Sequence, residues 1–322
     1  MKDVGRSGTH GGAWLVLVAA VLWGTTGTAA TFAPSAGPIA IGSAAMGIGG
    51  LLQALVAIRP LLRDAALLRA RPGVLALGAV SVAVYPLAFY AGMHLAGVAI
   101  GTVVALASGP IFAAVLERVV DGVPLDRRWA LSAALGVAGT ALLAIDGASA
   151  ESTWGDGTWR DSAVRDSAVR GSASGDAGGQ MPLGIVLALV AGATYALYTW
   201  AARRIMRAGA GSRAAMGAVF GIGGLLLVPV LVATGGPFLA DAQNLAVGAY
   251  MAVVPMFLGY LCFGAGLRTV AARSATVLTL AEPVVAAVLA WAVVGERLGP
   301  LGLGGIALIG ACLAALSFPR RG

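Results

Sequence analysis

One acidic residue, Glu282, stands well inside an apolar run and is followed directly by Pro283. A carboxylate in a bilayer costs roughly 2.5–3.5 kcal/mol on insertion scales, so it must face a polar cavity or a partner, or carry a proton. Proline removes a backbone donor, and interrupted helices near a membrane midplane commonly line binding sites. Glu282 is therefore a candidate for binding a cation or exchanging a proton. The alternative is a structural carboxyl bonded to its neighbours beside a kink.

Aromatic residues with a polar atom, and small hydroxyl residues, recur in the other apolar runs. The rings can line a cavity through stacking and cation–π contacts, or they can pack in the core. The hydroxyls can line the cavity too, or bond the backbone of their own helix. Besides Glu282 and Pro283, the candidate pathway residues are Trp23, Thr25, Thr26, Ser108, Pro110, Tyr195, Tyr198 and Tyr260.

The residue types on which most enzymes depend are scarce in this chain. The only histidines are His10 and His94, and both cysteines, Cys262 and Cys312, lie in apolar runs where packing is the expected role. No HExxH, CxxC, P-loop or GxSxG motif occurs. We therefore expect no enzyme activity, no metal site, no cofactor and no step driven by ATP.

The composition indicates an integral membrane protein. Hydrophobic types make up 59% of the chain and charged types 11%, against roughly 25% charged residues in a soluble domain. A spanning helix needs about 20 mostly apolar residues, and continuous rather than alternating runs favour helices over a barrel. The predicted helices cover 13–33, 37–58, 73–92, 97–118, 129–146, 182–202, 214–233, 244–267, 275–294 and 299–317.

The basic residues are distributed unequally between the two sides of such a bundle. With the N-terminus inside, 17 of the 21 Lys and Arg residues fall on the inside and 4 on the outside. The positive-inside rule then predicts that both termini are cytoplasmic. It also explains the net charge of +7 without nucleic acid as a partner.

A polar stretch divides the chain into two halves that resemble each other. The stretch is rich in Ser, Gly and Asp, so it cannot bury enough apolar surface to fold, and it falls on the outside. An offset of 173 residues superimposes Gly101–Leu116 on Ser274–Leu289 and Pro110 on Pro283. Because each half has five helices, the second half enters the membrane upside down.

We therefore predict an all-α integral membrane protein with ten transmembrane helices, arranged as two inverted five-helix repeats. The predicted units are a first repeat, a disordered extracytoplasmic linker and a second repeat, at 1–146, 147–181 and 182–322.

Three stretches point to a known family. They are LWGTTGTAATF (Leu22 to Phe32), LTLAEPVVAAVLAWAVVGERL (Leu278 to Leu298) and the Gly-rich last helix of each half. In these stretches the chain resembles the drug/metabolite transporter superfamily, in its ten-helix EamA-type branch. The first half has Gly109 where the second has Glu282, so the two halves need not contribute equally to a site.

The resemblance implies a bacterial inner-membrane carrier of small organic solutes, often working outward. Amino acids, amines, related metabolites and drugs are the substrates that it implies. We expect alternating access about a central cavity lined by the first and fourth helices of each half, with the proton as the candidate coupling ion. A membrane enzyme acting on a lipid or isoprenoid, and a channel, are the alternatives.

Small residues recur four positions apart on the last helix of each half. Such a stripe permits close backbone contact with another helix, either of the same chain or of a second copy. The chain is therefore expected to be a monomer or a homodimer. The stripes are Ser132, Gly136 and Thr140 in the first half and Ala307, Ala311 and Ala315 in the second.

Overall fold

The structure is a computed structural model that describes residues 4–153, 177–295 and 298–317. These residues form helices and no strand. The first half contains α1 (Val4–Ala30), α2 (Pro38–Val56), α3 (Ile58–Arg63), α4 (Ala65–Arg69), α5 (Pro72–Ala96), α6 (Val98–Val119) and α7 (Arg127–Thr153). The second half contains α9 (Ala177–Arg207), α10 (Ser212–Thr234), α11 (Gly236–Ala240), α12 (Ala242–Met251), η1 (Ala252–Leu258), α13 (Gly259–Gly266), α14 (Ala272–Leu278), η2 (Thr279–Ala281), α15 (Glu282–Leu289), η3 (Ala290–Val294) and α16 (Pro300–Ser317).

Ten helical segments of the described residues match the predicted spans. Nine are long and apolar enough to cross a bilayer, and the shorter apolar helix Pro300–Leu316 is the tenth. One span, Ala242–Gly266, runs through α12, the π-helical turn η1 and α13, and another, Ala272–Val293, runs from α14 into η3. The predicted all-helical membrane fold is confirmed.

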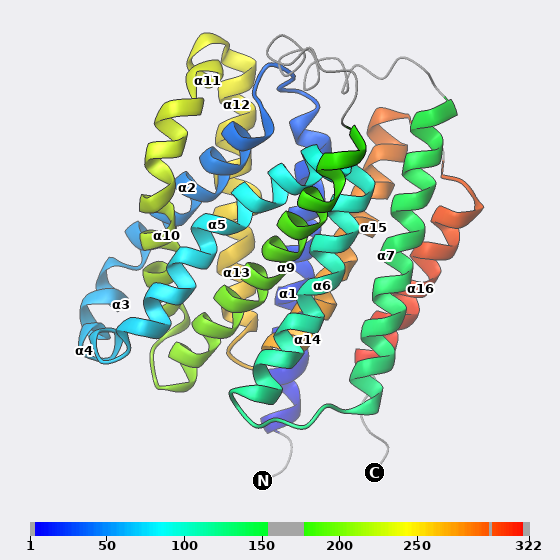
Figure 1. The fold of residues 1–322 in the computed structure, drawn as a ribbon. Coiled ribbons are helices and arrows are strands. Elements are labelled where there is room, and N and C mark those ends of the chain that lie inside the picture. Colours follow the sequence, from blue (N-terminus) through cyan, green and yellow to red (C-terminus); the bar gives the residue numbers. More distant parts are fainter. Residues whose placement is uncertain (1–3, 154–176, 296–297, 318–322) are drawn as a thin grey trace.

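The chain begins and ends at the same end of the bundle. α1 starts and α16 finishes at the end that we name the terminal face, and α7 finishes and α9 starts at the opposite end, the linker face (Figure 1). The helices extend into both ends of the predicted linker, because α7 continues to Thr153 and α9 begins at Ala177. Residues 154–176, the rest of that linker, lie outside the described residues.

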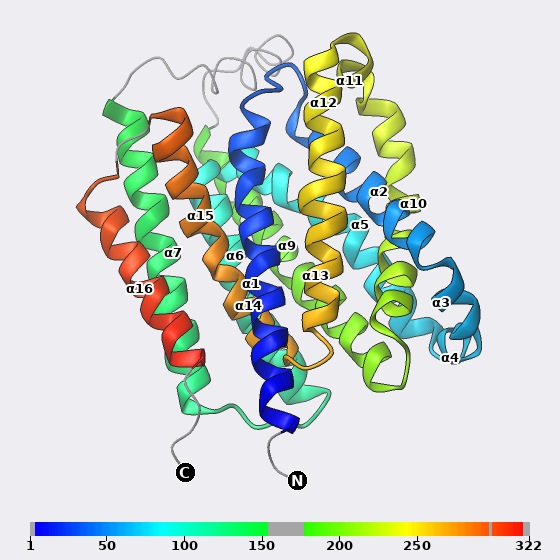
Figure 2. The same cartoon turned by 180° about the vertical axis from the view of Figure 1, so that it is seen from behind.

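The two halves are interleaved. α5 packs along α9, α2 along α10 and α7 along α16, and α6 also packs on α9, so each of these pairs joins one half to the other. Figures 1 and 2 show the same arrangement from two sides. The largest cluster of buried apolar side chains likewise draws on both halves, so the core forms between them.

The stripe of small residues packs within the chain in the first half but not in the second. Ser132 and Thr140 are buried, but Ala307 and Ala311 of α16 are exposed. α16 instead turns Gly305 toward α7, where an added Cβ would lie 2.6 Å from the carbonyl oxygen of Gly139. Two glycines facing each other allow a closer backbone approach than the alanine stripe does, and they decide which face of α16 is packed.

Two aspartates of the first half bind backbone N–H groups at the starts of helices in the second. Asp146 accepts a hydrogen bond of 2.8 Å from Gly299 before α16, and Asp64 accepts one of 2.8 Å from Gly211 before α10. Helix N-termini have unpaired N–H groups and partial positive charge, so carboxylates stabilise them. Arg63 also donates to Asp64 at 2.9 Å, and these bonds hold the pKa of that carboxyl below its usual range.

The two repeat-related prolines have different local structures. α6 runs through Pro110 as one α-helix, whereas the second half has a 3-10 turn, η2, directly before Glu282 and Pro283. Pro283 stands in the first turn of α15, where a missing N–H leaves no helical hydrogen bond unmade. The predicted helix interruption is thus present in the second half only.

Candidate functional site

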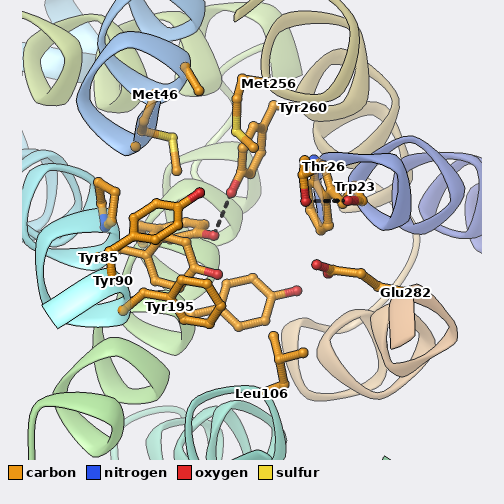
Figure 3. Close-up of a pocket in the computed structure, with 15 residues that line it drawn as sticks. Trp23, Thr26, Met46, Tyr85, Tyr90, Leu106, Tyr195, Met256, Tyr260 and Glu282 are labelled. Atoms are coloured by element: carbon orange, nitrogen blue, oxygen red, sulfur yellow. Dashed lines mark hydrogen bonds between the residues drawn. The ribbon is translucent and has the colours of Figure 1, made fainter. Parts of the chain in front are cut away.

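A cavity lies inside the bundle, between the two halves (Figure 3). The cavity has a volume of ≈ 600 Å³, which includes space open to solvent. The lining side chains are mainly aromatic or apolar, with one carboxyl. They are Trp23, Thr26, Gly42, Ala45, Met46, Tyr85, Pro86, Phe89, Tyr90, Leu106, Tyr195, Tyr198, Met256, Tyr260 and Glu282.

The cavity extends from near the linker face to the middle of the bundle. Thr26 and Gly42 each lie four residues from the linker-face ends of α1 and α2. At about 1.5 Å per residue, that places them about 6 Å from those ends. The deepest lining residues, Tyr198 and Tyr260, lie in the terminal-face halves of α9 and of the α12–α13 span.

A pair of tyrosines forms the floor of the cavity. The hydroxyls of Tyr198 and Tyr260 are 2.7 Å apart, and the two side chains are 1% and 3% exposed. The Phe220 ring packs against Tyr260 with the ring centroids 4.3 Å apart. The cavity is therefore closed toward the terminal face at this level.

Below the floor, Glu117 near the end of α6 joins the connection between α13 and α14. Its carboxylate accepts a hydrogen bond of 2.9 Å from the backbone N–H of Ala272 and lies 3.4 Å from Nε of Arg273. Arg203 of α9 donates to the carbonyl oxygens of Leu267 and Val270 in the same connection. Glu117 is 3% exposed, so these contacts form in the protein interior.

Asp121, just after α6, forms a second set of contacts with the end of α9. It accepts a hydrogen bond of 3.0 Å from Trp200 and pairs with Arg204 at 2.5 Å and Arg207 at 3.6 Å. Trp200 is buried beside Asp121. We name the contacts of Glu117, Asp121 and Arg203 the terminal-side network. It ties α6, α9 and the α13–α14 connection together.

Glu282 is the one acidic residue at the cavity among the described residues. Its carboxylate points from the start of α15 toward the aromatic side chains (Figure 3). It is partly exposed to the cavity, and none of the described residues forms a hydrogen bond or an ion pair with it. The structural alternative needed such bonds beside the kink. Tyr85, Tyr90, Tyr195 and Tyr260 lie close enough to interact with its charge.

Trp23 contacts the second half through its polar atom, and Tyr195 contacts the 3-10 turn η2 of its own half. Trp23 donates from Nε1 to the carbonyl oxygen of Pro255 at 2.9 Å, and its ring centroid is 4.7 Å from that of Tyr260. The Tyr195 and Thr279 hydroxyls are 2.7 Å apart. Because Thr279 donates its one proton to the carbonyl of Thr276, Tyr195 is the donor to Thr279. Tyr195 thus holds the 3-10 turn that precedes Glu282.

Six predicted pathway residues line the cavity and four do not. Trp23, Thr26, Tyr195, Tyr198, Tyr260 and Glu282 meet there. Thr25, Ser108, Pro110 and Pro283 are outside the lining.

The hydroxyl residues bond backbone, as the alternative for them proposed. Thr25 donates to Leu22, Thr26 to Trp23 and Ser108 to Ala105.

The expectation that the first and fourth helices of each half line the cavity was too narrow. α5 contributes four lining residues, Tyr85, Pro86, Phe89 and Tyr90, and α2 and η1 contribute Met46 and Met256. The available signal was the string YPLAFY, in which polar-tipped rings flank a proline inside an apolar run. No group of three His, Cys, Asp or Glu side chains within the described residues could hold a metal ion.

Comparison with known proteins gives concordant matches. The model of the EamA-like transporter family matches residues 10–145 and 182–318, one match to each half. The chain is 31% identical over 307 residues to the uncharacterized transporter YwfM of Bacillus subtilis (strain 168). The aligned region covers 95% of this chain and 93% of that protein. An uncharacterized transporter of Clostridium kluyveri is 32% identical over 127 residues, or 38% of this chain and 40% of that protein.

A solved crystal structure shares the fold, with a TM-score of 0.71 and 19% identity over 97% of this chain and 96% of that one. The family model matches both halves, and one relative spans nearly the whole chain, so these findings identify the family. The chain belongs to the EamA-like transporter family of the drug/metabolite transporter superfamily, and it is a multi-pass membrane transporter rather than an enzyme.

Proposed function

We propose that this transporter is a secondary exporter of small organic solutes that works by alternating access around the Glu282 cavity. The observation that carries the proposal is the free carboxyl of Glu282 in a cavity that the Tyr198–Tyr260 pair closes toward the terminal face. A deep carboxyl without a protein partner is available to a substrate or a proton. Amino acids, amines, related metabolites and drugs are the candidate substrates.

The proposed orientation places both termini in the cytoplasm and the linker outside the inner membrane. The distribution of Lys and Arg supports it, with 17 of 21 in segments that the sequence predicts to lie inside. In this orientation the cavity extends toward the outside, and the terminal-side network separates it from the cytoplasm. Export then requires a second state in which that network opens and the linker side closes.

Proton exchange at Glu282 is the proposed coupling step. One carboxyl cannot hold a proton and neutralise a substrate cation at the same time, so the two compete for it. A substrate that leaves to the outside can be replaced there by a proton, which returns with the empty carrier.

The test uses purified protein in vesicles. A carrier shows saturable counterflow of solute, whereas a channel or an enzyme does not. Glu282→Gln is nearly isosteric and should abolish gradient-driven transport without lowering the amount of folded protein. Glu282→Asp is the matched control, because it keeps the carboxyl and should retain partial transport. Full gradient-driven transport by the Gln variant would refute the role of Glu282.

The orientation has its own test in a variant without Cys262 and Cys312. A cysteine at Leu239, 86% exposed on α11 at the linker face, should react with an impermeant thiol reagent on intact cells. A cysteine at Arg71, exposed between α4 and α5 at the terminal face, should react only in inside-out vesicles. The reverse pattern would place the termini outside.

A further inference from the structure

We infer that the cavity selects small organic monocations, in which one ammonium group is joined to an aromatic or apolar body, and discriminates against substrates that carry a carboxylate. The inference rests on the proposed function, since it names the substrate class of the same site. It excludes zwitterionic amino acids from the wider set of candidate substrates.

The first argument is the charge balance of the lining. Among the described lining residues Glu282 is the one charged side chain, and no Lys, Arg or His is present. An ionised carboxyl that is removed from water needs a partner of opposite charge. A substrate ammonium supplies that partner, whereas a substrate carboxylate would add a second negative charge with no cation to balance it.

The second argument is that most polar groups of the lining are already bonded to protein. The indole N–H of Trp23 donates to Pro255, and the Tyr195 hydroxyl donates to Thr279. The hydroxyls of Tyr198 and Tyr260 bond each other. An oxyanion site requires several free donors that point at one position. The remaining phenol protons of this lining are one from the Tyr198–Tyr260 pair and those of Tyr85 and Tyr90, and neutral hydroxyls do not replace a cation.

The third argument is that aromatic side chains form most of the cavity lining. Rings of Trp23, Tyr85, Tyr90, Tyr195 and Tyr260 surround the space that the Glu282 carboxylate faces (Figure 3). Aromatic faces attract cations and also pack against apolar bodies. Since bulky rings and thioethers fill most of the lining, we expect the body to be small, such as one ring or a short alkyl group.

The unbranched thioethers of Met46 and Met256 add adjustable apolar contact at the same walls. These flexible side chains can adapt to apolar substrate groups of different shapes.

The experiment uses four probes that share one phenylethyl skeleton. Phenethylamine is the monocation, phenylalanine adds a carboxylate to it, 3-phenylpropionate is the anion and 2-phenylethanol is neutral. Calorimetric titration of the purified protein should show phenethylamine binding at least about tenfold more tightly than each of the others. Glu282→Gln should weaken phenethylamine binding at least about tenfold and leave 2-phenylethanol within about twofold.

Asp241→Asn is the matched control. It removes a carboxyl on the linker face that caps α12 outside the cavity, so binding of all four probes should stay unchanged. Phenylalanine or 3-phenylpropionate binding as tightly as phenethylamine would overturn the assignment. So would failure of phenethylamine to bind, or unchanged binding of phenethylamine by the Gln variant.

Vesicle counterflow separates this inference from the proposed function. Saturable counterflow of phenylalanine without counterflow of phenethylamine refutes the substrate class and leaves the carrier in place. Tight binding of phenethylamine without counterflow of any probe refutes the carrier and leaves the preference of the site in place.

Discussion

The hydroxyl oxygens of Tyr198 and Tyr260 lie 2.7 Å apart at the deepest point of the cavity. The two residues come from α9 and α13, and the terminal-side network links α9, through Arg203, to the connection that follows α13. Two successive layers of polar contact thus join the same helices. A solute can cross from the terminal side only if both layers separate.

The tyrosine pair predicts a specific pattern of stabilities. Tyr198→Phe or Tyr260→Phe leaves the other hydroxyl buried without its partner, which costs about 1–3 kcal/mol. The double variant removes both groups and should cost less than the sum of the single changes, by about 1 kcal/mol. Reversible unfolding in detergent micelles measures all three. Strictly additive losses would show that the two hydroxyls do not stabilise each other.

Glu117→Gln should favour the state that is open to the terminal face. The amide still accepts from the N–H of Ala272 but no longer attracts Arg273. Breaking a buried ion pair typically costs about 3–5 kcal/mol. A part of this free energy is enough to change the equilibrium between the closed state and the state open to the terminal face about tenfold.

The reporter is a cysteine at Ala202, which is fully buried on α9. Its labelling in inside-out vesicles should rise about tenfold in the Glu117→Gln variant. Asp241→Asn, at the opposite face, should leave the labelling rate unchanged. An unaltered rate in the Glu117→Gln variant, with normal protein levels, would mean that the network does not control access.

Two glycines on α1 provide a matched pair of substitutions near Glu282. A Cβ on Gly24 would lie 2.6 Å from Cβ of Val285 and 2.9 Å from the carbonyl oxygen of Glu282, whereas a Cβ on Gly27 meets nothing within 4 Å. Gly24→Ala should therefore push α15 away from α1, destabilise the protein by about 1–3 kcal/mol and reduce transport at least about tenfold. Gly27→Ala should match the unmodified protein in stability and in transport. Equal behaviour of the two variants would contradict a close contact between α1 and α15 at Gly24.

Asp64 predicts a pH dependence of stability. Its hydrogen bond from Arg63, with the one from Gly211, depresses its pKa in the folded state. A depressed pKa means that the stabilising contribution is present above the unfolded-state value and is lost as the pH falls through the folded-state value. The unfolding temperature of Asp64→Asn should therefore lie below that of the unmodified protein at about pH 7 and converge with it toward about pH 3. A constant difference across this range would contradict the ionic role.

Much of this architecture can be predicted from the sequence, because few kinds of backbone structure are stable in lipid. Continuous apolar runs predict spans, and the match of Pro110 with Pro283 predicts an inverted repeat. Glu282 stands out for the same reason, since a carboxyl at its depth is costly. Ala307 lies two residues from Gly305, so the two point about 200° apart around α16 and only Gly305 faces α7.

The lining of α5 could not be predicted on the same grounds. Tyr85, Phe89 and Tyr90 stand in an apolar run where the lipid-facing and cavity-facing sides have similar composition. Only contacts between the halves fix the rotation of α5, such as the packing of Gly78 against Ala201 and Val219. A local sequence pattern cannot predict such contacts, because they join residues far apart in the chain.

The interleaving of the two repeats bears on how the chain unfolds. α5, α2 and α7 each have their main partner in the other half, and Asp64 and Asp146 bind helix starts there as well. Neither half retains a closed apolar core once the other is removed. Loss of one repeat therefore exposes the packing surface of the second, and we expect the two repeats to unfold as a single cooperative unit.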